Sequence, residues 1–311
     1  MDIYESLSEM LLIDESEIVE YINKAPHKYK VYEIPKRNGH GTRTIAQPAR
    51  ELKVFQKLSL EHPLLNLPVH DAAFAYRDGI GIKQNAEVHA KNQYLLKMDF
   101  ADFFPSILDT DLITHIEKHH GKIDQRNKTA ISKLFFWRKK RDIINRLSIG
   151  APSSPFISNT LLYDFDEEIS NICTPLMITY TRYADDLIFT TNEPGILSNI
   201  PNVVVETLKS IKVPTLRINP QKTVYSSKKN NRHVTGLVLS NDDKVSLGRT
   251  RKRYIRSLVF QYHSENLASD DIVKLKGLLG FAKHIEPTFY SSLINKYSLD
   301  LILSIEKYDP A

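Results

Sequence analysis

The segment Tyr183-Ala184-Asp185-Asp186 lies between two short apolar runs rich in β-forming residues, Leu176–Tyr180 and Leu187–Thr191. The acidic pair therefore falls where a tight hairpin is expected to turn. Two carboxylates at a hairpin tip repel each other, and binding of a cation relieves the repulsion. Mg²⁺ prefers carboxylate oxygens, and two such ions can drive in-line displacement at phosphorus. A solvated acidic turn is the commoner explanation of an adjacent pair, so the choice depends on the rest of the chain.

A second carboxylate stands at the end of another predicted strand. The run 93–98 is apolar in its centre, and Asp99 follows it at the strand terminus. Asp99, Asp185 and Asp186 give three carboxylates from two remote segments, which is the minimum set for holding two Mg²⁺ ions on a nucleoside triphosphate. Asp102 is better explained as an N-cap or turn acceptor near the next helix. The second acidic site favours a metal centre over a solvated turn.

A turn rich in small residues lies between the two acidic sites. It reads Gly150-Ala151-Pro152-Ser153-Ser154-Pro155 and is followed by Asn159. Small residues let the backbone approach a ligand closely, and a helix that begins after Pro155 presents free N–H groups. By itself this pattern indicates only a turn before a helix. Its position between the acidic sites makes it a candidate part of the same site.

Composition and charge limit the class of protein. The chain has 311 residues, of which 41% are apolar, with a net charge of +5 and a pI near 9.0, so a polyanionic partner is favoured. Cys173 is the single cysteine, which excludes an intramolecular disulfide and fits a reducing compartment. No secretory signal and no run of roughly 20 apolar residues is visible. We therefore expect a cytoplasmic protein with no membrane partner.

Positive charge gathers in three clusters, at 138–141, 228–232 and 249–256. The last holds five cations and no acid in eight residues. On a helix, four of them share one face: Arg249, Lys252, Arg253 and Arg256. A charge run is usually a solvated surface, but beside a phosphoryl-transfer site these clusters predict contacts with nucleic-acid phosphates.

The hydrophobic pattern predicts a mixed helix and strand order. Helices are expected at 4–24, 51–62, 106–120, 125–137, 155–172 and from 249 onward, and strands at 29–34, 42–45, 93–98, 233–239 and 244–247. Strand signals stop near residue 248, where a basic helical region begins. This change places a provisional domain boundary between residues 1–247 and 248–311.

Taken in order, these motifs resemble those of reverse transcriptases, and within them the bacterial retron group. Asp99–Ile107 resembles motif A, Gly150–Asn159 motif B, and Tyr183–Asp186 the YxDD of motif C. Asn85–His89 resembles the NAxxH insertion of the retron group, and Val234–Gly236 its VTG signature. The likeness runs from about residue 30 to 240, and the ordered set is far more specific than any single motif.

The resemblance implies an α+β right-hand polymerase fold. Residues 1–247 would form fingers and a palm with an antiparallel sheet, and residues 248–311 an α-helical, RNA-binding thumb. The implied activity is RNA-directed DNA synthesis from dNTPs with two Mg²⁺ ions. The implied partner is a structured non-coding RNA that is both template and primer. Synthesis would start from the 2′-hydroxyl of an internal guanosine and give a branched RNA–DNA product, with a role in anti-phage defence beside an effector protein.

The resemblance also implies roles for single residues. Asp99 and Asp185 would ligate both metal ions, and Asp186 would complete the set. The dNTP site would comprise Arg43 (with Lys36 or Arg37) on the triphosphate, Phe104 as the steric gate against a 2′-hydroxyl, Ile149, Gly150, and Lys222 near the leaving pyrophosphate. Arg249, Lys252, Arg253 and Arg256 would bind RNA. Ile149 departs from the family, which commonly has glutamine there; isoleucine can only pack against the nucleotide. Core packing is the alternative for Phe104, and Phe103 is an equal candidate for it.

Two other functions remain possible from the sequence. One is a reverse transcriptase of another lineage, either intron-type or diversity-generating. The absence of a recognisable maturase or endonuclease segment after the thumb argues against the intron type. The other is a catalytically inert RNA-binding scaffold with the same fold, which the presence of all three carboxylates argues against.

Overall fold

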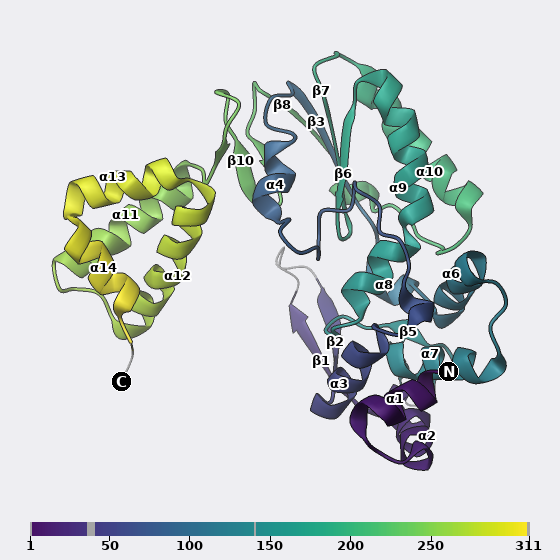
Figure 1. Cartoon of the computed structure of the whole chain (residues 1–311). Helices are drawn as coiled ribbons and strands as arrows, with labels where there is room; N and C mark the ends of the chain where they lie inside the picture. Colours follow the sequence, from purple (N-terminus) through teal and green to yellow (C-terminus); the bar gives the residue numbers. More distant parts are fainter. Residues whose placement is uncertain (1, 36–40, 140, 310–311) are drawn as a thin grey trace. The chain divides into compact units, whose positions relative to one another are not determined.

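A computed structural model describes residues 2–35, 41–139 and 141–309 (Figure 1). The chain divides into two compact units. The first comprises residues 1–78, 96–189 and 194–224, and the second comprises residues 79–95, 190–193 and 225–311. The expected boundary at 247/248 stays a prediction. In the part of the chain that is described, no helix combines the length and the apolar character needed to cross a bilayer.

The N-terminal segment forms two helices, so the prediction of one helix over 4–24 is wrong. Helix α1 spans Ile3–Leu11 and α2 spans Glu15–Lys24. Leu12 ends α1 in the left-handed region, with φ of 54°, and the Asp14 side chain accepts a hydrogen bond from Ser16 N to start α2. The hydrophobic period continues across this break because both helices pack on the same core, against α3 (Arg50–Ser59) and α7 (Gln125–Phe135).

Two strands form an exposed ribbon, as expected. β1 (Tyr29–Pro35) and β2 (Thr42–Pro48) are antiparallel, with Tyr32 opposite Ile45. The base of the ribbon is tied to the small-residue turn. Ala46 N donates to the Ile149 carbonyl at 3.2 Å, and Ser148 Oγ donates to the Ala46 carbonyl at 2.7 Å.

The central sheet has the strand order β6-β7-β3-β8. Its strands are β6 (Thr179–Tyr183), β7 (Asp186–Thr191), β3 (Tyr94–Asp99) and β8 (Val224–Ser227). A two-residue turn joins β6 to β7, which makes that pair antiparallel. Leu187, Ile188 and Phe189 are all fully buried, so this strand is covered on both faces. The antiparallel pair β6–β7 is the hairpin that the sequence around Tyr183–Asp186 predicts.

Helices cover this sheet and complete the first unit. Helix α9 (Tyr163–Cys173) contacts β6, and α10 (Ile200–Ile211) packs against α9 (Figure 1). The predicted single helix over 155–172 is two helices, because the chain bends at Leu162, whereas the helix expected over 106–120 is present as a single helix that begins at Asp109. The remaining elements are α8 (Ser154–Leu161), α5 (Phe103–Ser106), α6 (Asp109–His120), β4 (Phe136–Trp137) and β5 (Arg146–Leu147). Short 3-10 turns lie at Ala25–His27, Pro63–Leu65, Thr174–Leu176, Ile196–Asn199 and Pro220–Lys222.

The second unit combines a small sheet with four C-terminal helices. The sheet has the order β11-β10-β9 and contacts α4 (Ile82–Glu87). Its strands are β9 (Arg232–Val234), β10 (Leu237–Leu239) and β11 (Val245–Ser246). The helices are α11 (Arg249–His263), α12 (Ser269–Ile285), α13 (Pro287–Tyr297) and α14 (Leu299–Lys307). These helices pack against one another as a bundle (Figure 1). Their buried apolar side chains include Ile255, Leu275 and Leu293.

The Glu286 carboxylate joins three of these elements. It accepts hydrogen bonds from Ser246 Oγ at 2.9 Å, Leu247 N at 3.0 Å and Lys252 Nζ at 2.7 Å. Burial raises the pKa of this carboxyl, but the bonds from Lys252, Leu247 and Ser246 together outweigh it and leave the pKa below its usual value. Glu286 therefore fixes β11 and α11 to the start of α13.

We predict that Glu286→Gln destabilises the protein by about 1–2 kcal/mol at neutral pH, because a charge-assisted bond to Lys252 is lost. A lowered folded-state pKa means that Glu286 contributes stability above the ordinary carboxyl pKa and loses it as pH falls through the folded-state pKa. The difference in melting temperature between wild type and variant should thus shrink in acid. An equal difference at neutral and acidic pH would contradict this role.

Candidate active site

The end of β3 brings the two predicted acidic segments together. Phe100 N, directly after Asp99, donates to the Asp185 carbonyl at 3.0 Å. On the other side, Asn219 N donates to the Asp99 carbonyl at 2.8 Å, and Ala101 N donates to the Arg217 carbonyl at 2.8 Å. The Asp99 strand terminus therefore lies between the acidic turn and segment 217–219, which leads into the turn that carries Lys222.

The acidic turn has a constrained backbone. Ala184 and Asp185 form the turn between β6 and β7, and Ala184 is buried in the left-handed region with φ of 55°. An L-residue there costs about 1–2 kcal/mol, so the surrounding contacts must hold it. Asp186 is the first residue of β7. The turn thus places both carboxylates within two residues at one end of the sheet.

The three carboxylates influence one another. Asp99 is buried, with 5% of its surface exposed. Burial raises the pKa of Asp99, bonds from Lys222 oppose this, and the charge of Asp186 raises it further, with a net increase. The pKa of Asp185 is also raised, first by burial and then by Asp99 and Asp186. The arrangement is therefore electrostatically strained when all three groups are ionised.

Two lysines partly neutralise this charge. Lys222 Nζ lies 2.8 Å from both carboxylate oxygens of Asp99 and is half exposed. Lys97 Nζ lies 3.2 Å from Asp186 Oδ2. Sequence reasoning had assigned Lys222 to the leaving group and missed Lys97. The alternation of β3 places Lys97 and Asp99 on the same side of the strand, and that was a usable signal.

The donor set fits Mg²⁺. In residues 2–35, 41–139 and 141–309, no three His, Cys, Asp or Glu side chains already surround one point as a preformed metal site. The three Asp side chains nevertheless supply only hard oxygen donors, which is the chemistry that Mg²⁺ prefers. Burial and the charge of neighbouring carboxylates raise the pKa values of Asp99 and Asp185, and a bound divalent cation would relieve that repulsion. Asp99, Asp185 and Asp186 are therefore suited to hold such ions.

Three of the predicted dNTP-site residues line one hollow of about 390 Å³: Phe104, Ile149 and Gly150. Phe103 is buried, with 4% of its surface exposed, whereas Phe104 is partly exposed and lines the hollow. The structure thus separates the two rings: Phe103 packs in the core, and Phe104 borders the hollow. Arg43 is exposed on β2 and is not part of the lining, and Lys222 lies at Asp99 instead. Lys36 and Arg37 lie outside the described residues.

Gly150 explains how the small-residue turn approaches the ribbon. Its φ of 118° is a conformation that L-residues rarely adopt, and an added Cβ would lie 3.5 Å from Ile45 Cγ2. Ile149 is partly buried, and its carbonyl accepts the bond from Ala46 N. The Ile149 backbone therefore holds the turn against β2, while its side chain contributes apolar surface to the hollow.

Sequence reasoning missed three further lining residues, Tyr76, Lys53 and Lys57. Tyr76 has φ of 61°, and burial raises its pKa, as do the charges of Asp185 and Tyr183, while Arg43 opposes them. The phenol ring thus lies within electrostatic reach of the acidic turn. Lys53 and Lys57 are four residues apart on α3, which puts both on one face. No local pattern marks Tyr76, because its segment forms only an isolated bridge with β6.

The four predicted RNA-binding cations of α11 also come together. Arg249, Lys252, Arg253 and Arg256 line one hollow of about 530 Å³. Its other walls are Val238, Ser240, Ser246 and Gly248. Lys252 is already bound to Glu286, and the Arg256 guanidinium lies 5.1 Å from the Phe289 ring centre. The charge of Lys252 is therefore largely compensated within the protein.

The cluster at 228–232 is not a free cationic surface. Arg232 is fully buried, and its guanidinium donates to the carbonyls of Ala90, Asn92 and Ser240. Lys228 Nζ pairs with Asp243 Oδ1 at 2.6 Å. The prediction of phosphate contacts there is wrong for Arg232, which supports the local fold. Part of the cluster at 138–141 lies outside the described residues.

The two retron-like signatures meet in the second unit. Helix α4 carries the residues Asn85–Glu87, and Thr235 Oγ1 donates to the Ile82 carbonyl at 3.3 Å. His89 is fully buried, with Nδ1 2.7 Å from Thr190 Oγ1, and burial lowers its pKa to about 3. His89 is therefore neutral near physiological pH and acts as a packing group, not as a phosphate-binding cation.

Comparison with known proteins agrees with the site. Residues 34–239 match the family described as "Reverse transcriptase (RNA-dependent DNA polymerase)". The chain is 46% identical to the retron Ec83 reverse transcriptase of Escherichia coli over 282 residues, covering 90% of each chain. It is 34% identical to the retron Ec73 reverse transcriptase of the same organism, covering 89% of each.

Solved structures of telomerase are also similar. The telomerase of Candida albicans in complex with a TWJ fragment of telomeric RNA has a TM-score of 0.45 and 14% identity. That comparison covers 95% of this chain and 65% of the telomerase chain. The apo telomerase of Candida tropicalis has a TM-score of 0.48 and 12% identity, covering 89% of this chain and 61% of the other. The chain thus spans less than two thirds of the telomerase chains.

The matched region contains all three aspartates, the Gly150 turn and both retron-like signatures. It confirms the expected α+β polymerase fold class and the resemblance given by the ordered motifs. The 46% identity to the retron Ec83 enzyme, over nine tenths of its length, narrows the family assignment further. This chain belongs to the reverse transcriptase family of RNA-dependent DNA polymerases, and within it to the retron reverse transcriptases.

Proposed function

We propose that this chain copies a partner non-coding RNA into DNA, using dNTPs and two Mg²⁺ ions held by Asp99, Asp185 and Asp186. The observation that carries the proposal is the bond from Phe100 N to the Asp185 carbonyl, which joins the two acidic segments at one sheet end. Three carboxylates from remote segments are needed for a two-ion phosphoryl-transfer site. Membership of the reverse transcriptase family supports the same reaction.

The residues of the site then have separate tasks. When bound, the Mg²⁺ ions would activate the attacking hydroxyl and stabilise charge on the leaving pyrophosphate. Asp99, Asp185 and Asp186 hold those ions. Lys222 is half exposed beside Asp99 and supplies a mobile positive charge that can meet the pyrophosphate. Lys97 keeps Asp186 oriented through its contact with Oδ2.

The hollow beside the acidic turn fits the sugar and base of the incoming nucleotide. Phe104, Tyr76, Lys53 and Lys57 line it; the charge of Asp185 acts on Tyr76, and the two lysines add positive charge. A bulky ring beside the sugar excludes a 2′-hydroxyl by steric overlap, which selects dNTPs. Arg43 lies on β2 outside the lining and would reach the triphosphate from the ribbon.

The RNA partner extends this proposal. We further propose that this RNA is structured and serves as template and primer, that synthesis starts from the 2′-hydroxyl of an internal guanosine, and that the product is a branched RNA–DNA. Membership of the retron reverse transcriptases supports the nucleic-acid template partner. The cationic hollow of α11 suits a phosphate backbone. A role in anti-phage defence beside an effector protein belongs to the same proposal. A reverse transcriptase of another lineage is less well supported, given the 46% identity to a retron enzyme.

Asp185→Asn should lower DNA synthesis at least about a thousandfold, a loss of about 4 kcal/mol of transition-state stabilisation. The change removes charge from the metal-holding set and keeps the side-chain shape. Primer extension on the RNA that copurifies with the protein, with and without Mg²⁺, measures the effect. Binding of that RNA should stay within about twofold of wild type, because no cation of the α11 hollow is altered.

Asp185→Asn should also change the melting temperature in a defined direction, which serves as the control for correct folding. The raised pKa of Asp185 means that its charged form is unfavourable in the folded protein. Without metal at neutral pH, the variant should therefore melt a few degrees higher than wild type, and the gain should vanish below the ordinary carboxyl pKa. Substantial synthesis by this well-folded variant would overturn the metal assignment, and a wild type that makes no DNA would favour the inert scaffold.

Phe104→Ala should raise ribonucleotide incorporation relative to dNTP incorporation by about tenfold, because space opens beside the 2′ position. Competition between rNTP and dNTP at the first added nucleotides measures the ratio. Phe104→Tyr, which keeps the bulk of the ring, is the matched control and should retain dNTP preference. An unchanged ratio in a folded Phe104→Ala protein would return this ring to a packing role.

Replacing Arg249, Arg253 and Arg256 with glutamine should weaken binding to the copurifying RNA. The slope of log affinity against log salt should flatten by up to about three phosphate contacts. Lys252→Met is the control, because Lys252 is bound to Glu286 and should change the melting temperature more than the salt slope. Equal salt slopes for wild type and the triple variant would reject this surface as an RNA contact.

A further inference from the structure

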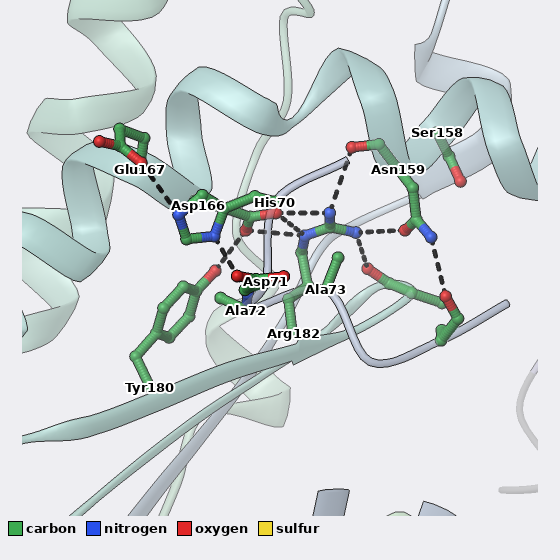
Figure 2. Close-up of polar contacts among 12 residues, drawn as sticks. His70, Asp71, Ala72, Ala73, Ser158, Asn159, Asp166, Glu167, Tyr180 and Arg182 are labelled. Atoms are coloured by element: carbon green, nitrogen blue, oxygen red, sulfur yellow. Dashed lines mark hydrogen bonds and ion pairs between the residues drawn. The ribbon is translucent and has the colours of Figure 1, made fainter. Parts of the chain in front are cut away.

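Arg182 is a fully buried cation one residue before the Tyr183–Asp186 turn. Its Nε lies 2.9 and 3.0 Å from the two Asp166 carboxylate oxygens, and its Nη2 lies 2.6 Å from Asp166 Oδ2 (Figure 2). Both side chains have no exposed surface. Asp166 is on α9 and Arg182 on β6, so the pair joins the helix to the strand that leads into the acidic turn.

The rest of the guanidinium reaches toward the turn and toward α8. Nη1 donates to Asn159 Oδ1 at 3.1 Å and to the Ala184 carbonyl at 3.3 Å. Nη2 also lies 3.5 Å from the Asn159 carbonyl. Arginine has five N–H donors in a fixed planar fork, and this network uses that geometry fully. Lysine has a single ammonium and cannot span Asp166, Asn159 and Ala184 together.

Stability alone gives no reason for such a pair. Taking two charges out of water carries a desolvation cost, and well-packed apolar residues of similar volume often give equal or higher stability. What an apolar replacement could not supply is the bond to the Ala184 carbonyl. Ala184 is the residue in the left-handed conformation, and Asp185 follows it directly. The arginine therefore contacts the one backbone position on which the direction of the acidic pair depends.

The same network reaches the nucleotide hollow. Asn159 Nδ2 donates to the Ala75 carbonyl at 2.8 Å, one residue before Tyr76. The Arg182 backbone also bonds this segment, since Arg182 N donates to the Ala72 carbonyl at 2.7 Å and Phe74 N donates to the Arg182 carbonyl at 2.8 Å. One buried group thus contacts both the acidic turn and the segment that carries Tyr76.

We propose that Arg182, oriented by Asp166 and Asn159, is a positioning residue that holds the acidic turn in its metal-binding geometry against the repulsion of its own carboxylates. Phe100 N fixes the Asp185 carbonyl from the β3 side, and Arg182 Nη1 fixes the Ala184 carbonyl from the helix side. The two bonds hold adjacent peptide groups of the turn. That metal ions bind at this turn rests on the proposed function, whereas the contacts that position the turn do not depend on it.

Tyr180 provides a matched control inside the same network. Its hydroxyl donates to Asp166 Oδ1 at 2.7 Å, whereas the bonds to the Ala184 carbonyl and to Asn159 Oδ1 come from Arg182 (Figure 2). Tyr180→Phe therefore disturbs the buried carboxylate without touching the turn. A purely structural network would respond similarly to Tyr180→Phe and to Arg182→Lys. A positioning network responds at the metal site only to Arg182→Lys.

The experiment measures Mn²⁺ binding to full-length protein by electron paramagnetic resonance of the free ion, in the absence of dNTP. Wild type, Arg182→Lys and Tyr180→Phe are compared, with Asp185→Asn as the baseline for ions bound elsewhere. Arg182→Lys should bind Mn²⁺ about tenfold more weakly than wild type, a change of about 1.4 kcal/mol. The Mg²⁺ concentration for half-maximal DNA synthesis should rise by a similar factor. Tyr180→Phe should lower the melting temperature but keep Mn²⁺ affinity within about twofold of wild type.

The result that overturns the proposal is wild-type Mn²⁺ affinity in folded Arg182→Lys protein. If that variant does not fold, Asn159→Ala replaces it, because it removes one partner of Nη1 and leaves the Asp166 pair intact. Unchanged Mn²⁺ affinity in folded Asn159→Ala would likewise overturn it, and weakened affinity would support it. Failure of the proposed function is a separate result: wild type then makes no DNA, while the difference in Mn²⁺ affinity between wild type and Arg182→Lys can still be measured.

Discussion

The hydrogen bond between Phe100 N and the Asp185 carbonyl is the contact on which the site depends. It joins two segments whose side chains repel each other. Burial and the charge of neighbouring carboxylates raise the pKa of both Asp99 and Asp185. Backbone pairing in the sheet supplies the free energy that keeps them together without a metal. The lysines at Asp99 and Asp186 reduce the repulsion further. The fold thus brings the backbones of the acidic segments together, and metal binding would draw the carboxylates of Asp99, Asp185 and Asp186 onto the ions.

Local sequence patterns predicted the parts of this site that are local. The acidic turn, the strand before Asp99 and the Gly150 turn each follow from a few neighbouring residues. The helix over 4–24 was wrong because Leu12 and Asp14 break the backbone while the hydrophobic period continues on both sides. Tyr76, Lys53 and Lys57 were missed for a different reason. They line the hollow only because segments that are far apart in the sequence lie together in the fold. No local sequence pattern indicates that proximity.

Charge was the least predictable property. A run of lysines and arginines looks uniform in sequence, yet the structure divides its members by their partners. Arg232 bonds backbone carbonyls, Lys228 pairs with Asp243, and Lys252 is held by Glu286. Arg182, outside these runs, is fully buried like Arg232, although an arginine within a β-strand is expected to face solvent. Counting cations therefore overestimates the surface available to a phosphate backbone.

The residues proposed for catalysis and the two retron-like signatures occupy different parts of the chain. The three aspartates, the Gly150 turn and the Arg182 network lie in the first unit, whereas the Asn85–His89 and Val234–Gly236 signatures lie in the second. There Thr235 of the second signature bonds the Ile82 carbonyl at the start of α4, the helix that carries residues of the first, and Lys83 Nζ donates to the His284 carbonyl of α12 at 3.0 Å. A neutral, buried His89 cannot bind phosphate by charge. The contacts of these signature segments thus lie within the second unit, and we propose that they influence which RNA is bound by supporting the C-terminal helices, whereas the residues proposed for catalysis lie in the first unit.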